Sequence, residues 1–242
     1  MTTRTAPQPL LTTIDLGDRT APLTARVNRR ARRLIITVDS VAGRVIVTAP
    51  SKRAIPEAID FARTRSSWIK SQLSEALGAR PFISGSAFPL RGRSTEIVQS
   101  GATRSAVRLD GERLFVGGDE VHINRRVTDW LKRQARAAVT ERVDFYAGAL
   151  NRKRGAISIR DTRSRWGSCA ADGSLSFSWR LILAPPAILD YVAAHECAHL
   201  VYLNHSPAFW RLLRELGVDA GGARDWFSAN GSDLYAYGAL AA

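Results

Sequence analysis

The chain has 242 residues, of which 45% are hydrophobic and 24% are charged. This balance is typical of a soluble globular protein, and it excludes a largely disordered chain, a collagen-like chain and an integral membrane protein. The length allows one large domain or two small ones. Lysine and arginine outnumber aspartate and glutamate by 35 to 22, a net charge of +13 that bears on partners and solubility but not on the fold.

Cysteine content and apolar runs bear on the cellular compartment. Two cysteines are too few for a disulfide framework. No stretch reaches the roughly 18 apolar residues of a membrane span, and residues 1–20 lack a compact apolar segment before a small-residue cleavage site. We therefore expect a loose lead-in over 1–20 and a cytoplasmic protein with reduced thiols and no membrane contact.

Residues 21–120 are expected to form a β-rich N-terminal region with one helix. Alternating β-branched residues over 23–49 predict a hairpin whose turn lies at 39–43. Short strands are predicted over 82–118, where Asp110-Gly111 is typical of a second hairpin turn. No internal repeat is visible in the sequence.

Two long helices are predicted from apolar residues that recur every three to four positions. The first covers 55–77 and includes Trp68 in its apolar stripe. The second covers 124–150 and has other faces rich in lysine and arginine. With four arginines at 27–33, these basic faces could bind nucleic acid through phosphates, or they could be a solvated surface. The cations expected to face solvent on the second helix are Arg125, Lys132, Arg133, Arg136 and Arg142.

Residues 121–242 are expected to form the second domain. Strand character returns over 156–183, after the predicted 124–150 helix. Alternate apolar residues place one face of the last strand at Leu175, Phe177, Trp179 and Leu181. Pro185-Pro186 then opens a helix, because proline is tolerated in a first turn.

The pattern that most specifically indicates a catalytic or metal-binding site is the segment His195-Glu196-Cys197-Ala198-His199. His195 and His199 stand four residues apart, which places both rings on one face of a helix with Cβ atoms about 5–6 Å apart. Two imidazoles at this spacing can bind one zinc ion. Glu196 points beside the metal, where its carboxylate can accept a proton from water.

A catalytic zinc needs a third protein ligand and an open position. His205 is the best third candidate, but the chain must leave the helix and turn back to bring it to the same ion. Asn204 suits this exit because asparagine tolerates the left-handed backbone conformation. Ser206 and Pro207 fit the N-cap and the first position of a new helix. Glu215 is a weaker alternative third ligand.

Three segments of the chain resemble the YgjP-like metallopeptidase family, which is similar to the SprT-like and WLM zinc proteases. They are Arg163–Cys169 with the sequence RSRWGSC, Ser178–Leu181 with SWRL, and the region from His195 to Trp210. The resemblance is tight over 156–215 and looser over the β-rich part. The fold that it implies is α+β, a zincin-like catalytic domain with a small twisted sheet over the HExxH helix.

By this resemblance His195, His199 and His205 are the zinc ligands and Glu196 is the catalytic glutamate. The metzincin proteases share the six-residue step to a third histidine, but they have a glycine midway, where this chain has Tyr202. That departure argues against membership of the metzincins and leaves open how the loop turns.

An edge strand beside the metal-binding helix can bind extended substrate by adding it to the sheet, and the 156–183 hairpin is the candidate here. Arg165 and Arg180 could stabilise the oxyanion or pair with a substrate carboxylate, and Trp166 could contact substrate. The alternatives are a structural salt bridge for each arginine and a core position for the tryptophan. Cys197 is predicted to point away from the metal.

The sequence thus predicts a metallopeptidase that holds one zinc ion (Zn2+) per chain and hydrolyses a peptide or protein substrate through a zinc-activated water. One alternative is a basic nucleic-acid-binding protein with a structural or inactive zinc site, and another is a protease recruited to DNA-bound proteins. Glu196 favours the enzyme, because a structural site needs no base and would be closed by a fourth protein ligand. No sequence feature indicates an oligomeric state.

Overall fold

The computed structural model covers two compact units, Met1–Arg80 with Ala239–Ala242, and Pro81–Gly238. The described residues are 9–17, 20–39, 42–74, 78–101, 106–162 and 165–239. Outside them lie residues 1–8 of the expected lead-in, Ser40 and Val41 of the expected hairpin turn, 75–77 of the first predicted helix, and Arg163 and Ser164 of the RSRWGSC segment.

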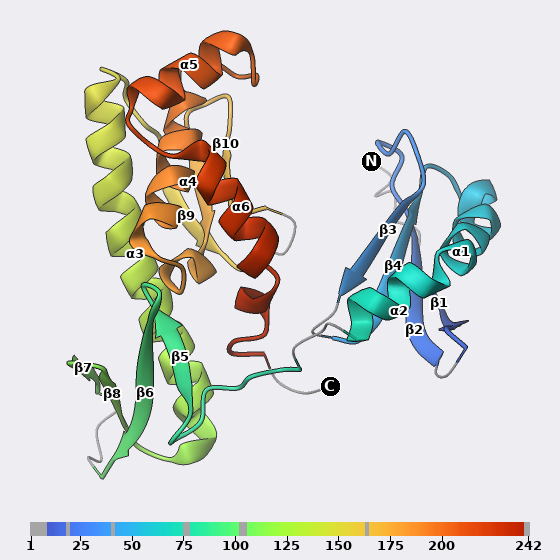
Figure 1. The fold of residues 1–242 in the computed structure, drawn as a ribbon, viewed down its shortest axis with the longest axis horizontal. Coiled ribbons are helices and arrows are strands. Elements are labelled where there is room, and N and C mark those ends of the chain that lie inside the picture. Colours follow the sequence, from blue (N-terminus) through green and yellow to red (C-terminus); the bar gives the residue numbers. More distant parts are fainter. Residues whose placement is uncertain are drawn as a thin grey trace, which may run out of the picture. The chain divides into compact units, whose positions relative to one another are not determined.

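The first unit is a four-stranded sheet with two helices packed against it (Figure 1). Its elements are β1 (Leu10–Asp15), β2 (Thr20–Val27), β3 (Ile35–Asp39), β4 (Arg44–Ala49), the short 3-10 helix η1 (Lys52–Ala54), α1 (Ile55–Thr64) and α2 (Ser66–Ser74). The strand order is β1-β2-β4-β3, with a parallel central pair between two antiparallel pairs. Leu23 and Val47 of the sheet share one apolar core with Ala62 and Ile69 of the helices.

The structure confirms the hairpin predicted over 23–49, which is β3–β4. The loose lead-in expected over 1–20 is corrected in part, because this segment contains strand β1. Ile14 of β1 is buried in the core of the unit, which holds the strand in place. The single helix predicted over 55–77 is wrong, since α1 ends before Arg65, whose φ of −108° and ψ of 17° depart from helical values. Trp68, expected in the apolar stripe, is 47% exposed.

The second unit begins with a sheet of the same topology. Its strands are β5 (Ala87–Leu90), β6 (Arg93–Ser100), β7 (Val107–Asp110) and β8 (Arg113–Gly117), in the order β5-β6-β8-β7. The central pair is again parallel and the outer pairs antiparallel. The predicted hairpin at Asp110-Gly111 is confirmed as β7–β8, with Gly111 at φ 58°. The topology repeats without a visible sequence repeat, because strand pairing uses backbone hydrogen bonds that many sequences satisfy.

The units divide after Arg80, so the domain boundary expected at 120/121 lies inside the second unit. A shared core explains the difference. Ile97 and Leu114 of the second sheet belong to the same buried cluster as Leu131 of the long helix that follows. The boundary at 120/121 was expected because the sequence before it is rich in strands. A high content of strands does not show which hydrophobic core each strand joins.

The rest of the second unit is a helical layer with a small sheet. Its elements are η2 (Glu120–His122), α3 (Ile123–Ala149), β9 (Ile157–Arg160), β10 (Gly167–Cys169), β11 (Leu175–Ser178), η3 (Trp179–Ile182), α4 (Pro186–Ala198), α5 (Pro207–Glu215), α6 (Ala220–Asn230) and η4 (Asp233–Tyr235). The sheet order is β10-β11-β9, which leaves β10 at an edge. The helix predicted over 124–150 is confirmed as α3. The strand predicted through Leu181 ends at Ser178, whose hydroxyl accepts a hydrogen bond from the Arg180 N–H (3.4 Å) and caps η3.

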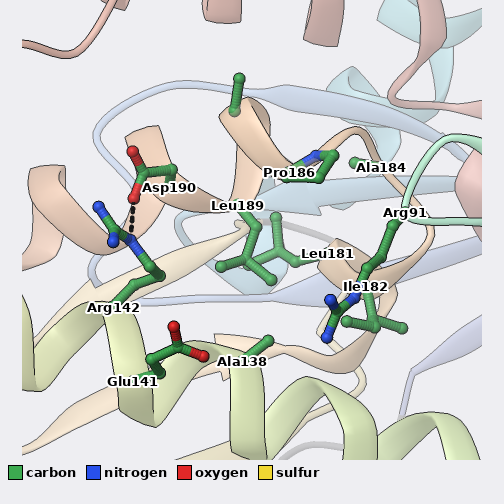
Figure 2. A pocket seen from close by; sticks show the side chains of 11 residues that line it. Arg91, Ala138, Glu141, Arg142, Leu181, Ile182, Ala184, Pro186, Leu189 and Asp190 are labelled. Carbon is green, nitrogen blue, oxygen red and sulfur yellow. Dashed lines mark hydrogen bonds and ion pairs between the residues drawn. The ribbon is translucent and has the colours of Figure 1, made fainter.

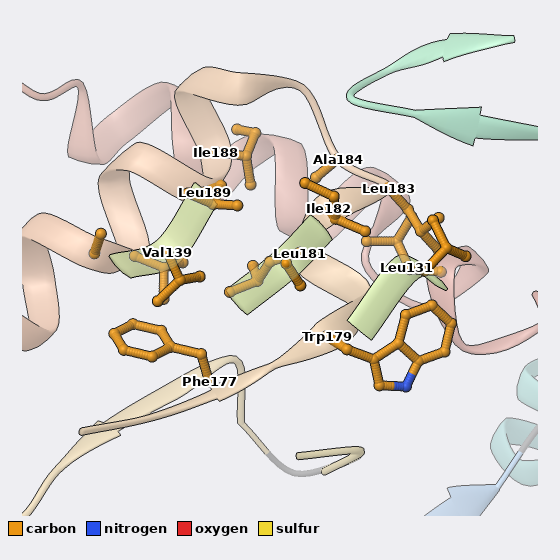
Figure 3. Close-up of a cluster of buried hydrophobic side chains, with 14 of the residues drawn as sticks. Leu131, Val139, Phe177, Trp179, Leu181, Ile182, Leu183, Ala184, Ile188 and Leu189 are labelled. Atoms are coloured by element: carbon orange, nitrogen blue, oxygen red, sulfur yellow. The ribbon is translucent and has the colours of Figure 1, made fainter. Parts of the chain in front are cut away.

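The core of the second unit holds α4 against α3 (Figure 3). Leu131 and Val139 of α3 face Phe177 of β11, Trp179 of η3 and Leu189 of α4, and all five are buried. Each such side chain contributes about 1.5–3 kcal/mol of burial free energy. The fold is therefore mixed α+β. Among the described residues, no helix is long and apolar enough to cross a membrane.

Candidate active site

Helix α4 carries the first part of the histidine pattern. Pro186 occupies its first turn, as the sequence predicts, and the helix ends at Ala198. His199 is the C-cap and keeps helical dihedrals (φ −68°, ψ −16°), so the four-residue step from His195 still places both rings on one face. The two ring centroids are 5.0 Å apart.

The loop after α4 turns through side-chain and carbonyl contacts. The carbonyl of Tyr202 accepts a hydrogen bond from Nδ1 of His199 (2.9 Å), and Asn204 Oδ1 accepts one from the backbone N–H of Ser206 (3.2 Å). The left-handed exit expected at Asn204 is wrong, because its φ is not positive. The predicted helix start is confirmed: Ser206 caps α5 by accepting from the Phe209 N–H (3.4 Å).

The turn brings His205 to the other two histidines. One ring nitrogen from each of His195, His199 and His205 lies within 4.8 Å of the other two. The Nε2 atoms of His195 and His205 are 3.0 Å apart, close to the roughly 3.3 Å that two nitrogens about 2.0–2.1 Å from one tetrahedral ion would show. Phe209 stacks on His199 at 4.7 Å and Trp210 on His205 at 5.7 Å, so α5 fixes both rings.

The chemistry of these donors suits a metal ion. Burial, and then the neighbouring His199 and His205, lower the pKa of His195 to about 4, so its ring is neutral at pH 7. Nδ1 of His199 donates to a carbonyl, which leaves Nε2 with its lone pair. Neutral imidazoles are the form that binds metals. Cys197 lies away from the cluster, with Sγ 3.7 Å from the carbonyl of Val143 on α3, as predicted.

Glu196 is buried beside the histidine cluster. Only 6% of it is exposed, and burial raises the pKa of its carboxyl to about 7, although the charge of Arg165 and the backbone N–H of Cys169 act in the opposite direction. The edge strand β10 passes very close to it: a Cβ built on Gly167 would lie 2.5 Å from Glu196 Oε1. Any larger residue at position 167 would therefore force the Glu196 side chain to move.

A cavity of about 260 Å³ opens next to Glu196. Its lining consists of Trp166, Gly167, Tyr191, Val192, His195, Glu196, Arg224 and Phe227. Trp166 is stacked between Phe227 (4.9 Å) and Tyr235 (5.0 Å), so its ring is both a packing element and part of the cavity wall. A compact space beside a buried carboxylate and a potential metal site is the usual form of an active site.

The sequence model of a family described as YgjP-like, metallopeptidase domain matches residues 32–230. The chain belongs to the YgjP-like metallopeptidase family. The matched region contains the three histidines and Glu196 and reaches into both units. Comparisons with curated proteins and with solved structures find no match.

Two arginines predicted to bind substrate in this YgjP-like chain differ in placement. Arg165 is exposed and acts electrostatically on Glu196. Arg180 is 3% exposed and does not line the cavity. Its guanidinium pairs with Asp161 (2.8 and 3.2 Å) and donates to the carbonyls of Leu234 (2.7 Å) and Tyr237 (2.6 Å). Arg180 therefore forms a structural salt bridge, which was the alternative to substrate binding.

Sequence reasoning missed two polar residues of the YgjP-like cavity, Tyr191 and Arg224. Tyr191 stands one helical turn before His195, and their rings are 5.7 Å apart, so the spacing that identified His199 could also have identified it. Arg224 lies on α6, with its guanidinium 5.3 Å from the Trp210 ring. No local pattern connects α6 to the motif, because only tertiary packing brings them together.

Several cations of α3 in the YgjP-like chain have structural partners. Arg136 donates to the carbonyl of Ile157 (3.0 Å), and Arg125 lies 3.6 Å from Asp129. Arg142 pairs with Asp190 at the edge of a separate cavity of about 400 Å³ (Figure 2). That cavity contains none of the three histidines. Fewer cations on α3 are therefore available to bind the phosphates of a nucleic acid than the sequence alone suggests.

Proposed function

We propose that this chain is a zinc-dependent metallopeptidase with a zincin-like active site. The observation that carries the proposal is a buried carboxylate, Glu196, next to three converging imidazoles and facing a cavity. A structural metal site would use a fourth protein ligand and would need no buried base. The family to which the chain belongs is described by a metallopeptidase domain, which supports the same reaction class.

The residues fit zinc. His195, His199 and His205 would hold the ion, and three protein ligands with an open fourth position are the usual arrangement of catalytic zinc. When bound, zinc supplies a Lewis acid that lowers the pKa of water towards about 7 and polarises a carbonyl.

Glu196 is the general base of the proposed reaction. Its carboxylate accepts a proton from the attacking water as the new C–O bond forms at the scissile carbonyl. The same oxygen then donates that proton to the leaving amine as the C–N bond breaks. The backbone N–H of Cys169 holds the carboxylate in place, and the positive charge of Arg165 stabilises its ionised form.

The edge strand β10 is the proposed substrate platform. The Trp166 carbonyl accepts from the Ser178 N–H of β11 (2.9 Å), and the Ala170 N–H donates to the carbonyl of Ser174, just before β11 (2.8 Å). The backbone groups of Gly167 and Cys169 therefore point to the open edge, because successive residues of a strand alternate in the direction of their backbone groups. The Cys169 N–H is taken by Glu196, which leaves the Gly167 N–H and C=O for an extended peptide. A substrate side chain would then enter the cavity beside Trp166.

The test measures metal content and hydrolysis together. Purified protein should hold about one zinc per chain and cleave fluorescein-labelled casein, and chelation with 1,10-phenanthroline should abolish cleavage until zinc is restored. His205→Ala should lose zinc on dialysis and keep its fold. Glu196→Gln should keep zinc and lose on the order of 10²–10⁴ in rate. Glu215→Gln is the matched control, since Glu215 is not part of the cluster, and both properties should stay unchanged.

Two outcomes would reject the proposal. The first is a wild-type protein that retains zinc and cleaves neither casein nor short peptides. The second is a Glu196→Gln variant that cleaves casein at the wild-type rate, because the amide cannot accept the proton from water. The first outcome would leave the alternative of a basic protein with a structural zinc site.

A further inference from the structure

The positive charge of the chain is concentrated in the first unit. Residues 1–80 contain 14 lysines and arginines against 6 acidic residues, a net charge of +8. The second unit, about twice as long, has 21 against 16, a net charge of +5. None of the proposed metal ligands lies in the first unit. Most of the net charge therefore lies in the unit that contains none of the proposed metal ligands.

An open cleft of about 470 Å³ lies on the first unit, between β3 with the residues before it and the two helices. We call it the Trp68 cleft. Its lining consists of Arg33, Leu34, Ile35, Ile36, Phe61, Arg65 and Trp68. Trp68 is 47% exposed, although its neighbour Ile69 is fully buried in the core. An indole that helix α2 presents to solvent is available as a flat surface for a ligand.

The cations of the cleft are free to bind an anion. Arg33 and Arg65 are exposed, and neither has a carboxylate partner within the described residues. Arg65 lies 5.8 Å from the centroid of the Phe61 ring. The ion pairs described in this unit, Arg44–Asp39 and Arg63–Asp60, use residues outside the cleft.

We propose that the Trp68 cleft binds single-stranded nucleic acid, with a base stacked on Trp68 and phosphates paired with Arg33 and Arg65. Aromatic rings next to a basic groove are the elements of sequence-independent single-strand binding, because every base has a flat face and every nucleotide a phosphate. In a duplex both faces of each base are already stacked, so an indole has access only to an unpaired base. Arg29, Arg30 and Arg32 precede the cleft residue Arg33 in the sequence, and none of the three has a carboxylate partner within the described residues.

The experiment measures fluorescence anisotropy of labelled oligo(dT), about 12 nucleotides long, with the full-length protein at low salt. Trp68→Ala should weaken binding by about 5- to 100-fold, and Trp68→Phe should retain most of it. Arg33→Gln and Arg65→Gln should each reduce the slope of log K against log salt by about 0.7. Arg63→Gln is the matched control: it removes the same charge from α1 at a residue outside the cleft, and it should preserve the affinity of the wild type.

An oligonucleotide of the same length with abasic sites separates stacking from charge, and a duplex of the same sequence tests the strand preference. Both should bind more weakly than oligo(dT). Absence of binding at tens of micromolar protein would overturn the proposal. Equal affinity for the abasic strand, or a Trp68→Ala variant that binds like wild type, would overturn it too and would indicate charge alone. Glu196→Gln should bind oligo(dT) normally, so failure of the peptidase proposal would not affect this result.

Discussion

The contact between β10 and Glu196 gives a sharp test of the proposed mechanism, the substitution Gly167→Ala. The added Cβ would lie 2.5 Å from Oε1, 2.7 Å from Cγ and 2.9 Å from Cδ of Glu196, whereas ordinary van der Waals contact begins at 3.4 Å. The clash includes Cγ as well as the flexible end, so the whole carboxylate must move by about 0.9 Å. The three atoms nearest to the added Cβ all belong to Glu196, so the clash acts on Glu196 first.

A displacement of about 1 Å at a reacting group can cost about 10² in rate. We therefore expect Gly167→Ala to lower kcat/KM for casein about 100-fold, equivalent to about 2.7 kcal/mol of transition-state stabilisation, with zinc content unchanged. Gly148→Ala is the matched control. Gly148 lies exposed near the end of α3, and an added Cβ would meet no atom within 4 Å apart from the backbone of its own helix. The change should raise helix stability by at most about 1 kcal/mol without affecting the rate. Full activity of Gly167→Ala, with zinc bound, would refute the placement of Glu196 as the base.

Three further predictions concern the support of the site. Arg180→Gln should lower the free energy of unfolding in urea by about 2–3 kcal/mol, because Asp161 and the carbonyls of Leu234 and Tyr237 lose their cation. An unchanged urea midpoint would contradict this structural role. Ser206→Ala should cost about 1 kcal/mol in the same assay through loss of the α5 cap, and Ser206→Thr should restore most of it. Ellman's reagent at pH 8 should label at most one thiol of the native chain, since burial raises the pKa of Cys197 to about 12 while Cys169 is only part-buried; two rapid reactions would contradict the packing.

The histidine cluster could be predicted from sequence because much of its geometry is local. The step from His195 to His199 follows from helical periodicity, and the cap at Ser206 follows from side-chain chemistry. The conformation of the loop between them could not be predicted. Asn204 uses its side chain to hold the turn, where a left-handed backbone was expected, because either solution satisfies the same backbone groups.

The rest of the site depends on tertiary contacts that local patterns do not encode. Arg180 stands in a strand-like alternation, yet η3 buries it against the last described segment of the chain. Arg224 reaches the cavity from α6, and Trp166 gains its stacking partner Tyr235 from η4. The unit boundary after Arg80 likewise reflects which core each sheet joins.

The repeated sheet topology has a consequence for the order in which the chain is assembled. In each copy the parallel central pair joins two hairpins, so neither sheet is complete until its fourth strand exists. The first copy and its helices are complete by Ser74, and His195 follows more than a hundred residues later. At about 5–20 residues per second of synthesis, this gap lasts on the order of ten seconds. The N-terminal copy therefore has time to fold on the ribosome before the residues of the proposed active site have been synthesised. It would then no longer be an unfolded segment that the proposed peptidase activity could cleave.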